Sequence, residues 1–188
     1  MNDTHWQTHH ELTKNDPPSV LLVQALEYVE KRNRALDIGD GALKDARYLL
    51  EQGFVVDVVD QEKKLDIPLD ERLRYHASSF DDFTFEKKSF DIASAMFALP
   101  FNPPETFSSV FQSVKESLVK GGVFCGQLFG IRDEWINNSR MTFHTKEQID
   151  LLLSDMEVLS LVEREKDSHL ADGTPKHWHL FHIIARKP

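Results

Sequence analysis

Cysteine is almost absent from this sequence. One of its 188 residues is a cysteine, Cys125, so an intrachain disulfide is excluded, and a lone thiol is typical of a reducing compartment. Because Cys125 stands in the apolar segment 123–129, we expect it to be a small core residue rather than a nucleophile.

Long apolar runs are absent as well. No segment reaches the roughly 18 consecutive apolar residues that a membrane span requires. The opening residues, MNDTHWQTHHELTKNDPP, contain no apolar stretch of the kind found in secretory signals. The sequence therefore predicts a cytoplasmic protein without a membrane partner.

Basic residues are fewer than acidic ones. The chain has 22 Lys and Arg residues against 31 Asp and Glu, which gives a formal net charge of −9. An acidic surface repels a phosphate backbone, and no long basic run offsets this repulsion. A nucleic-acid partner is therefore not expected.

The sequence also lacks a recognisable metal-binding pattern. His177, His179 and His182 stand close together, yet no cysteine pair or quartet of ligands accompanies them. On a strand, His177 and His179 would share one face and His182 would lie on the other. We expect no metal, and histidines that pack at a sheet edge or line a pocket.

A regular alternation of strand and helix patterns is present. Strands are predicted at 34–38, 54–59, 73–77, 90–96, 123–129, 157–165 and 178–185, and helices at 19–31, 43–52, 105–119 and 145–153. Thr145 and Gln148 form a capping-box pattern, and Asp172-Gly173 is a hairpin turn signal. Pro68 interrupts the short segment after Asp60, where we expect an irregular connection rather than a full crossover helix.

This alternation predicts an α/β fold. Strands that alternate with helices form a three-layer sandwich around a mostly parallel sheet, here seven-stranded, and the closing hairpin places one antiparallel strand near the edge. The length suits a single domain over residues 1–188, with a core at 34–188 and a helical segment at 1–33.

A carboxylate and two glycines stand where the first strand meets a helix, in the order Asp37-Ile38-Gly39-Asp40-Gly41. Glycines at such a turn let the backbone approach a ligand closely, and ligands of open α/β sheets bind at this end of the strands. The next strand ends at Asp60, where an acid can accept hydrogen bonds from both ribose hydroxyls.

The same segment argues against a dinucleotide cofactor. The third glycine of the dinucleotide-binding pattern is replaced by Lys44. The Asp37 carboxylate would repel a pyrophosphate, whereas it suits the ammonium group of a methionine-like ligand. An oxidoreductase on a Rossmann fold is thus the less favoured alternative.

These residues resemble a known enzyme class. The segments LDIGDGALKDARYLLEQGF and VVDVVDQ resemble the first two motifs of class I S-adenosylmethionine-dependent methyltransferases, SFDIASAMFALPF their fourth-strand motif, and LVKGGVFCGQLFG the following strand. MTFHT and KHWHLFHIIARKP, with Trp6 and the early prolines, resemble a bacterial subgroup related to tellurite-resistance-type methyltransferases. The resemblance implies a Rossmann-like fold, S-adenosylmethionine as cofactor and in-line methyl transfer to a small-molecule acceptor.

The resemblance also assigns cofactor-binding residues. Asp37, Gly39, Asp40 and Gly41 would line the methionine part, Asp60 would bind the ribose, Gln61, Ser79 and Phe80 would lie beside the adenine, and Ala95, Met96 and Phe97 would form the wall near the sulfonium. Residues 1–33 would cover this site.

The chain departs from the family pattern at three positions. Leu43 replaces a third glycine and is expected to crowd the cofactor entrance, Asp40 replaces a common cysteine, and Ser79 replaces an acid for which Asp81 could substitute. The alternative reading is therefore a catalytically degenerate module that binds a cofactor or a protein partner.

Two histidines and one Asn-Pro-Pro segment are the remaining candidates for the site. His76 and His144 are the candidate general bases near the strand ends, since the mechanism itself requires no protein nucleophile. Asn102-Pro103-Pro104 is interpreted as a loop followed by a helix start, because Glu105 stands where amino-methyltransferases have an aromatic residue.

Two further expectations concern solvent and the terminus. Asp57 is expected to face solvent from the second strand. His5, Trp6, His9 and His10 could cover the pocket, although a frayed terminus is the default expectation.

Overall fold

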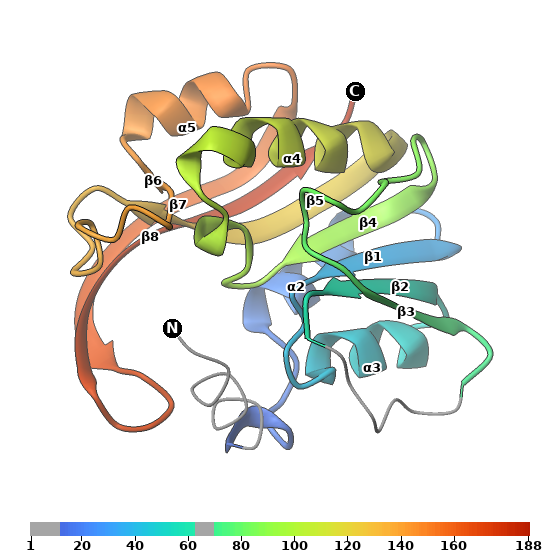
Figure 1. The fold of residues 1–188 in the computed structure, drawn as a ribbon. Helices are drawn as coiled ribbons and strands as arrows, with labels where there is room; N and C mark the ends of the chain where they lie inside the picture. Colours follow the sequence, from blue (N-terminus) through green and yellow to red (C-terminus); the bar gives the residue numbers. More distant parts are fainter. Residues whose placement is uncertain (1–11, 63–69) are drawn as a thin grey trace.

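Seven strands form a continuous sheet in the order β3-β2-β1-β4-β5-β8-β7 in a computed structural model, which describes residues 12–62 and 70–188 (Figure 1). They are β1 (Arg34–Ile38), β2 (Val55–Asp60), β3 (Leu73–Ala77), β4 (Phe90–Ala95), β5 (Leu118–Gly130), β7 (Glu157–His169) and β8 (Pro175–Arg186). An eighth strand, β6 (Phe143–His144), pairs with the end of β5 off this path.

The strand directions match the predicted sheet. All neighbouring strands run parallel except β8, which is antiparallel to both β5 and β7. One antiparallel strand therefore lies beside the edge strand, as predicted. The pattern analysis missed β6, because two residues are too short to show a period.

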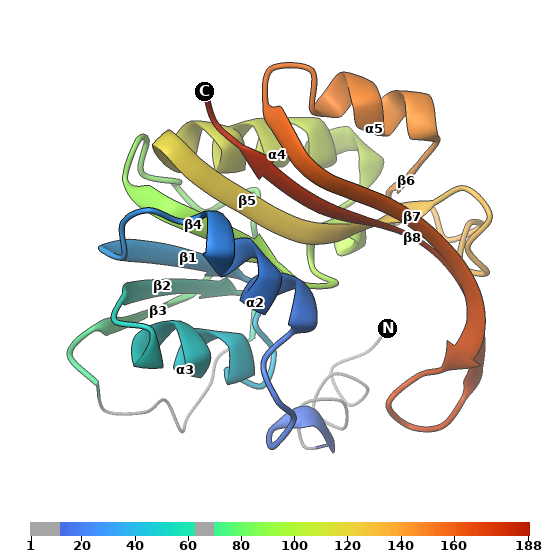
Figure 2. The same cartoon turned by 180° about the vertical axis from the view of Figure 1, so that it is seen from behind.

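Helices cover both faces of the sheet, which confirms the three layers. The helices α4 (Pro104–Ser117) and α5 (Lys146–Leu152) lie on one face, and α2 (Val20–Ala25) and α3 (Lys44–Glu51) lie on the other (Figures 1 and 2). Two short 3-10 turns, η1 (Leu26–Tyr28) and η2 (Leu99–Phe101), follow α2 and β4.

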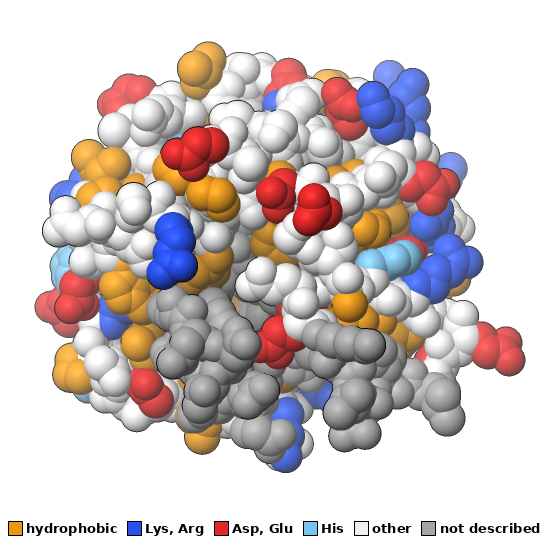
Figure 3. Space-filling view, in the orientation of Figure 1, with side chains coloured by type: hydrophobic (Ala, Val, Ile, Leu, Met, Phe, Trp, Pro, Cys, Tyr) orange, Lys and Arg blue, Asp and Glu red, His pale blue; other side chains and the backbone are white. Residues whose placement is uncertain are grey.

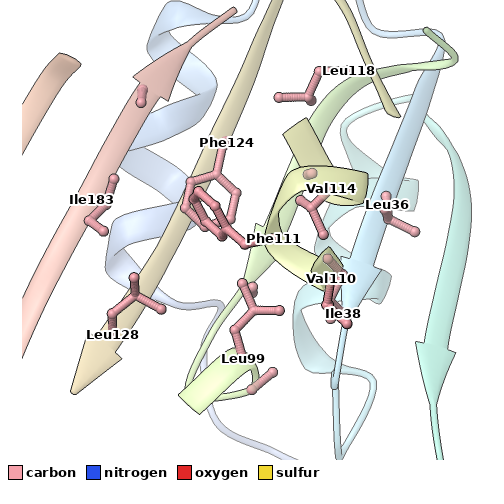
Figure 4. Packing of buried hydrophobic residues seen from close by; sticks show 14 of the residues in the cluster. Leu36, Ile38, Leu99, Val110, Phe111, Val114, Leu118, Phe124, Leu128 and Ile183 are labelled. Atoms are coloured by element: carbon pink, nitrogen blue, oxygen red, sulfur yellow. The ribbon is translucent and has the colours of Figure 1, made fainter. Parts of the chain in front are cut away.

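Two buried clusters hold the layers together. On the α4 face, Phe111 packs edge-to-face on Phe124 of β5 at a ring separation of 5.2 Å, with Val114 beside them (Figure 4). Truncation of a buried phenylalanine to alanine typically costs about 3–5 kcal/mol. On the opposite face, Cys125 is fully buried with the leucines of α2 and α3, and burial raises the pKa of its thiol. The expectation of a core cysteine is confirmed.

Several predicted element ends were wrong. The first helix ends at Ala25 instead of residue 31, and α4 ends at Ser117 because Leu118 already pairs with Phe90 in the sheet. Strand pairing thus overrides the helical pattern of this segment. The capping box of α5 is confirmed, since Thr145 and Gln148 exchange reciprocal hydrogen bonds.

The last hairpin is longer than its predicted strands. Pairing between β7 and β8 continues to His169 and Pro175, and Gly173 adopts a φ of +85° at the predicted turn. The hairpin curls away from the sheet, and its tip lies on the same side of the molecule as residues 12–16 (Figures 1 and 2). It therefore forms a side wall rather than a flat sheet edge.

Asp57 corrects a prediction. Instead of facing solvent it is buried, at 4 % exposure, where it accepts hydrogen bonds from Arg34 at 3.1 Å and pairs with His76 at 3.0 Å. β2 lies between β1 and β3, and these strands supply Arg34 and His76, so the buried carboxylate is satisfied by ion pairs. The connection predicted around Pro68 lies outside the described residues.

In the described part of the chain, no helix is both long and apolar enough to cross a bilayer.

Candidate ligand-binding site

A cavity of about 670 Å³ opens at the carboxyl ends of the parallel strands. Its lining comes from the loops after β1, β2, β3 and β4, from residues 12–19, and from the inner face of the β7–β8 hairpin. Open α/β sheets bind their ligands in this place. A volume of this size accommodates a small-molecule ligand.

Asp37, the residue before the last of β1, is a buried acid that lines this cavity. The Leu36 and Ile38 side chains point to the α4 face, so the alternation of the strand turns Asp37 toward the opposite layer. Its Oδ1 accepts a short hydrogen bond from the Ser94 hydroxyl. Its Oδ2 is buried, and no hydrogen-bond donor in the described residues reaches it. This oxygen is therefore a buried hydrogen-bond acceptor that a ligand could satisfy.

The environment of Asp37 disfavours its charge. Burial, followed by the negative charge of Asp45, raises the pKa of Asp37 to about 7. Asp45 is itself held in place, because the backbone N–H and the hydroxyl of Ser19 donate to its carboxylate at 2.7 and 2.6 Å. A cationic group beside Asp37 would relieve this repulsion.

Gly39 makes the turn after β1 possible. Its φ is +68°, and a Cβ at this position would lie 2.5 Å from the Ala98 Cβ and 3.3 Å from the Phe80 ring. A side chain here would therefore collide with the neighbouring loops. The bare backbone keeps the chain close to the floor of the cavity.

Asp60 links two loops around the cavity. One carboxylate oxygen accepts from the Gly41 N–H at 3.2 Å, and the other accepts from the Glu62 N–H at 2.9 Å. A carboxylate has about four acceptor sites, so these two hydrogen bonds leave capacity for ligand hydroxyls.

The predicted adenine-side residues reach the same cavity. Gln61, Ser79, Phe80 and Asp81 all line it. The Ser79 hydroxyl donates to Asp82 at 2.7 Å, rather than acting with Asp81. Ser79 and Asp81 thus both line the cavity but form no hydrogen bond with each other.

Leu43 does not crowd the cavity entrance, contrary to the sequence expectation. Its φ of +60° is the left-handed conformation that explains why a glycine is common at this position. The side chain is 4 % exposed, packs in the α2–α3 cluster, and is not part of the cavity lining. A leucine thus fits because it points into the core.

The wall after β4 is only partly as predicted. Met96 and Phe97 line the cavity, whereas Ala95 is fully buried in the sheet and does not. Phe97 has a φ of +52°, and its N–H donates to the Gln127 Oε1 at 3.2 Å. Gln127 also lines the cavity, and no sequence motif singled it out.

An aromatic group forms the far side of the cavity. The Trp178 ring lies 5.5 Å from that of Phe97 and 5.7 Å from that of Trp135. Phe101 and Phe129 complete this aromatic wall, with ring centres 5.7 Å apart. The aromatic content of these segments was visible in the sequence, but their convergence depends on the curl of the hairpin.

The candidate bases His76 and His144 lie outside the cavity lining. His76 pairs with Asp57. His144 is buried against Phe107 at a ring separation of 4.7 Å, and burial lowers its pKa to about 4. Of the histidines in residues 12–62 and 70–188, His169 and His182 line the cavity.

The prolines and the N-terminal segment are placed as follows. Pro104 begins α4, as expected, while Asn102 and Pro103 line the cavity. From the first segment, Leu12, Thr13, Asp16 and Ser19 also line it. His5, Trp6, His9 and His10 lie outside the described residues. Among the residues described, no group of three metal-ligating side chains converges.

The comparisons with known proteins agree on the fold. No protein-family model matches the chain, and no curated protein matches its sequence. Three solved structures show the likeness. An S-adenosylmethionine-dependent methyltransferase from Methanosarcina mazei has a TM-score of 0.62 at 17 % identity, covering 86 % of this chain and 96 % of its own.

A second match is 1,6-didemethyltoxoflavin-N1-methyltransferase from Burkholderia thailandensis, solved with 1,6-didemethyltoxoflavin and S-adenosylhomocysteine. Its TM-score is 0.67 at 19 % identity, over 98 % of this chain and 84 % of that one. TehB from Haemophilus influenzae gives 0.71 at 14 % identity, over 89 % and 61 %. The chain has the Rossmann-like fold of class I S-adenosylmethionine-dependent methyltransferases, as predicted.

Proposed function

We propose that this chain is a methyltransferase that uses S-adenosylmethionine to methylate a small molecule. The observation that carries the proposal is the pair of buried carboxylates, Asp37 and Asp60, at the ends of two adjacent parallel strands in one cavity. Fold alone does not establish activity, so the chemistry of these residues is what supports the proposal.

The residues present fit this cofactor. The partnerless Asp37 oxygen suits an ammonium group, and the bare turn at Gly39 leaves room for the methionine chain. Asp60 would hold the ribose hydroxyls, while Gln61, Ser79 and Phe80 would contact the adenine. The cofactor supplies an electrophilic methyl group on a sulfonium sulfur when bound.

The chain's own residues would position the two substrates and shield them from water. Phe97 and Trp178 would present aromatic faces between the two halves of the cavity, where a positively charged group gains about 0.5–2 kcal/mol from a ring. These rings, together with Phe129 and Trp135, would exclude water from the acceptor. No side chain needs to act as nucleophile.

His182 would act as the general base when the acceptor atom still carries a proton that must be removed. It lines the cavity and lies opposite Gln127 in the β5–β8 register. Burial, and then the nearby charges of Arg164 and Lys166, lower its pKa from the usual value, so it is neutral at pH 7 and can accept a proton. His144 and His76 point elsewhere.

A small acceptor is favoured over a nucleic acid by size and charge. A cavity of about 670 Å³ suits a small molecule better than a polymer. On the face in Figure 3, blue side chains gather mainly toward the right-hand edge with red ones spread among them. The formal net charge of −9 works against a phosphate backbone.

Calorimetric titration with S-adenosylmethionine and S-adenosylhomocysteine tests the proposal, with NAD as a comparison ligand. We expect micromolar binding of both sulfur ligands and none of NAD. Asp60→Ala should abolish binding, while Glu51→Gln, a change at an exposed acid ending α3, should leave it unchanged. A folded protein that binds neither ligand would overturn the proposal.

The alternative, a degenerate module, loses one of the observations that favoured it. Leu43 points into the core and so does not obstruct the cofactor. Ser79 remains as the position where an acid is common. Binding of S-adenosylmethionine without turnover on any acceptor would favour this alternative.

A further inference from the structure

The two faces of the β7–β8 hairpin carry opposite charges. On the outer face, Glu163, Glu165 and Asp167 are paired with basic groups. Arg132 bonds Glu163 at 2.8 Å and Glu165 at 2.7 Å, and His177 bonds Asp167 at 2.7 Å. These three acids are therefore satisfied away from the cavity, whereas Asp172 at the hairpin tip lines it.

The inner face carries unpaired positive charge. Arg164 and Lys166 alternate with those acids along β7, so they project to the other side of the strand, and both line the cavity. Within the described residues neither forms an ion pair or side-chain hydrogen bond, whereas the three acids that alternate with them all do. Asp172, at the hairpin tip, accepts from the Thr174 N–H.

The strand register sets these cations over apolar surface. Lys166 lies opposite Trp178 and Arg164 lies opposite Leu180. Trp178 in turn contacts Phe97 and Trp135. This part of the cavity thus combines aromatic rings packed edge-to-face with two cationic groups that form no ion pair within the described residues.

The other half of the cavity has the opposite charge. Asp37, Asp40, Asp45 and Asp60 surround the turn after β1. A cationic cofactor fits the acidic half, and the same reasoning applied to the hairpin half selects a ligand of negative charge.

We propose that the acceptor is a small aromatic molecule with an anionic group, whose ring lies on Trp178 and whose anion binds Arg164 and Lys166. This inference depends on the proposed function, because it names the second substrate of the same cavity. The anionic group anchors the molecule, and the atom that receives the methyl group lies at its other end, toward Phe97. Arg164 can bind a carboxylate in two-pronged fashion, which also fixes the ring orientation.

Matched pairs of acids and amides test the inference. The probes are 2-naphthoate with 2-naphthamide, benzoate with benzamide, and indole-3-acetate with indole-3-acetamide, titrated by calorimetry with and without S-adenosylhomocysteine. We expect at least one acid to bind about tenfold more tightly than its amide. Raising the salt concentration should weaken the acid and spare the amide.

Variants assign the preference to the hairpin. The double change Arg164→Gln and Lys166→Gln should lower the affinity for the acid by about tenfold and leave the amide within about twofold. Lys120→Gln, at an exposed lysine at the far end of β5, removes a similar charge and should change neither. Melting temperatures should stay equal for all three proteins, since the altered residues are exposed.

Three results would overturn the inference: no acid binds, acids and amides bind equally, or the double variant weakens both alike. The S-adenosylhomocysteine titration keeps the two proposals apart. Loss of its binding would count against the methyltransferase proposal, while acid preference can still be measured without it.

Discussion

The backbone N–H of Phe97 donates a 3.2 Å hydrogen bond to the side-chain oxygen of Gln127, which joins the loop after β4 to the neighbouring strand β5. Phe97 has a φ of +52°, a conformation that costs a residue other than glycine about 1–2 kcal/mol. Gln127 is buried and shares the cavity with Phe97. This hydrogen bond holds the aromatic ring where the two halves of the cavity meet.

Gln127→Leu should therefore loosen the loop after β4. Without its acceptor, the Phe97 amide should exchange its hydrogen about tenfold faster or more, because local opening no longer breaks a hydrogen bond. Amide hydrogen exchange followed by NMR measures this. Gln112→Leu, on the exposed side of α4, serves as the control, and equal exchange rates in the two variants would contradict the assignment.

Gly39→Ala should be more damaging than Gly53→Ala. Both glycines have positive φ, at +68° and +96°, so both changes introduce left-handed strain of about 1 kcal/mol. Only the Cβ at position 39 meets other atoms, 2.5 Å from the Ala98 Cβ, while the space around Gly53 is open. An overpacked contact adds about 1–3 kcal/mol.

Urea unfolding and S-adenosylhomocysteine titration compare these two variants. Gly39→Ala should unfold more easily and lose the ligand, whereas Gly53→Ala should keep it. Equal stability of both variants would show that the turn after β1 is not confined as described.

Substitutions of Leu43 test its inward orientation. Leu43→Ala removes a buried side chain and keeps the strained φ, while Leu43→Gly removes the side chain and relieves the strain. Loss of a buried leucine costs about 2–5 kcal/mol against about 1 kcal/mol of strain relief. Both variants should be destabilised, Leu43→Ala the more so, with cofactor affinity within about threefold of the parent. Tighter binding in Leu43→Gly would restore the crowding hypothesis.

The pH dependence of stability should reveal Asp37. Its pKa is about 7 in the folded protein and about 3.9 in an unfolded chain, so the folded state binds the proton more tightly. The ligand-free protein should therefore lose stability as pH rises from about 4 to about 7, and remain at that level above. Asp37→Asn lacks this penalty and should be more stable at pH 8, by at most about 4 kcal/mol.

Thermal unfolding of both proteins between pH 4 and pH 8 measures this difference. The gap should narrow toward pH 4, where Asp37 is protonated in the folded state and about half protonated in the unfolded chain. The same variant should bind S-adenosylhomocysteine more weakly, because it cannot pair with an ammonium group. A gap independent of pH would exclude Asp37 as its source.

Most of the sheet and half of the site could be predicted from the sequence. The alternation of strand and helix patterns predicted a mostly parallel sheet but not its strand order, and Asp37 and Asp60 were expected at one edge because the ends of parallel strands meet there. The hairpin half of the cavity was not predicted, because the placement of Trp178, Arg164 and Lys166 depends on how far the hairpin extends and curls. Periodicity marks which strand face a residue occupies, but not which face meets a cavity.

Single side chains were harder still. Leu43 occupies a glycine position in the motif, and only its packing in the α2–α3 cluster shows that it points inward. Asp57 was expected in solvent because its partners, Arg34 and His76, come from two other strands. Long-range ion pairs of this kind leave no local sequence signal.

A crystal structure of the chain with S-adenosylhomocysteine tests the central claim most directly. We expect the ligand ammonium beside the Asp37 Oδ2, the ribose hydroxyls on Asp60, and the sulfur facing Phe97. A ligand bound elsewhere, or one with its ammonium away from Asp37 in the same cavity, would contradict it.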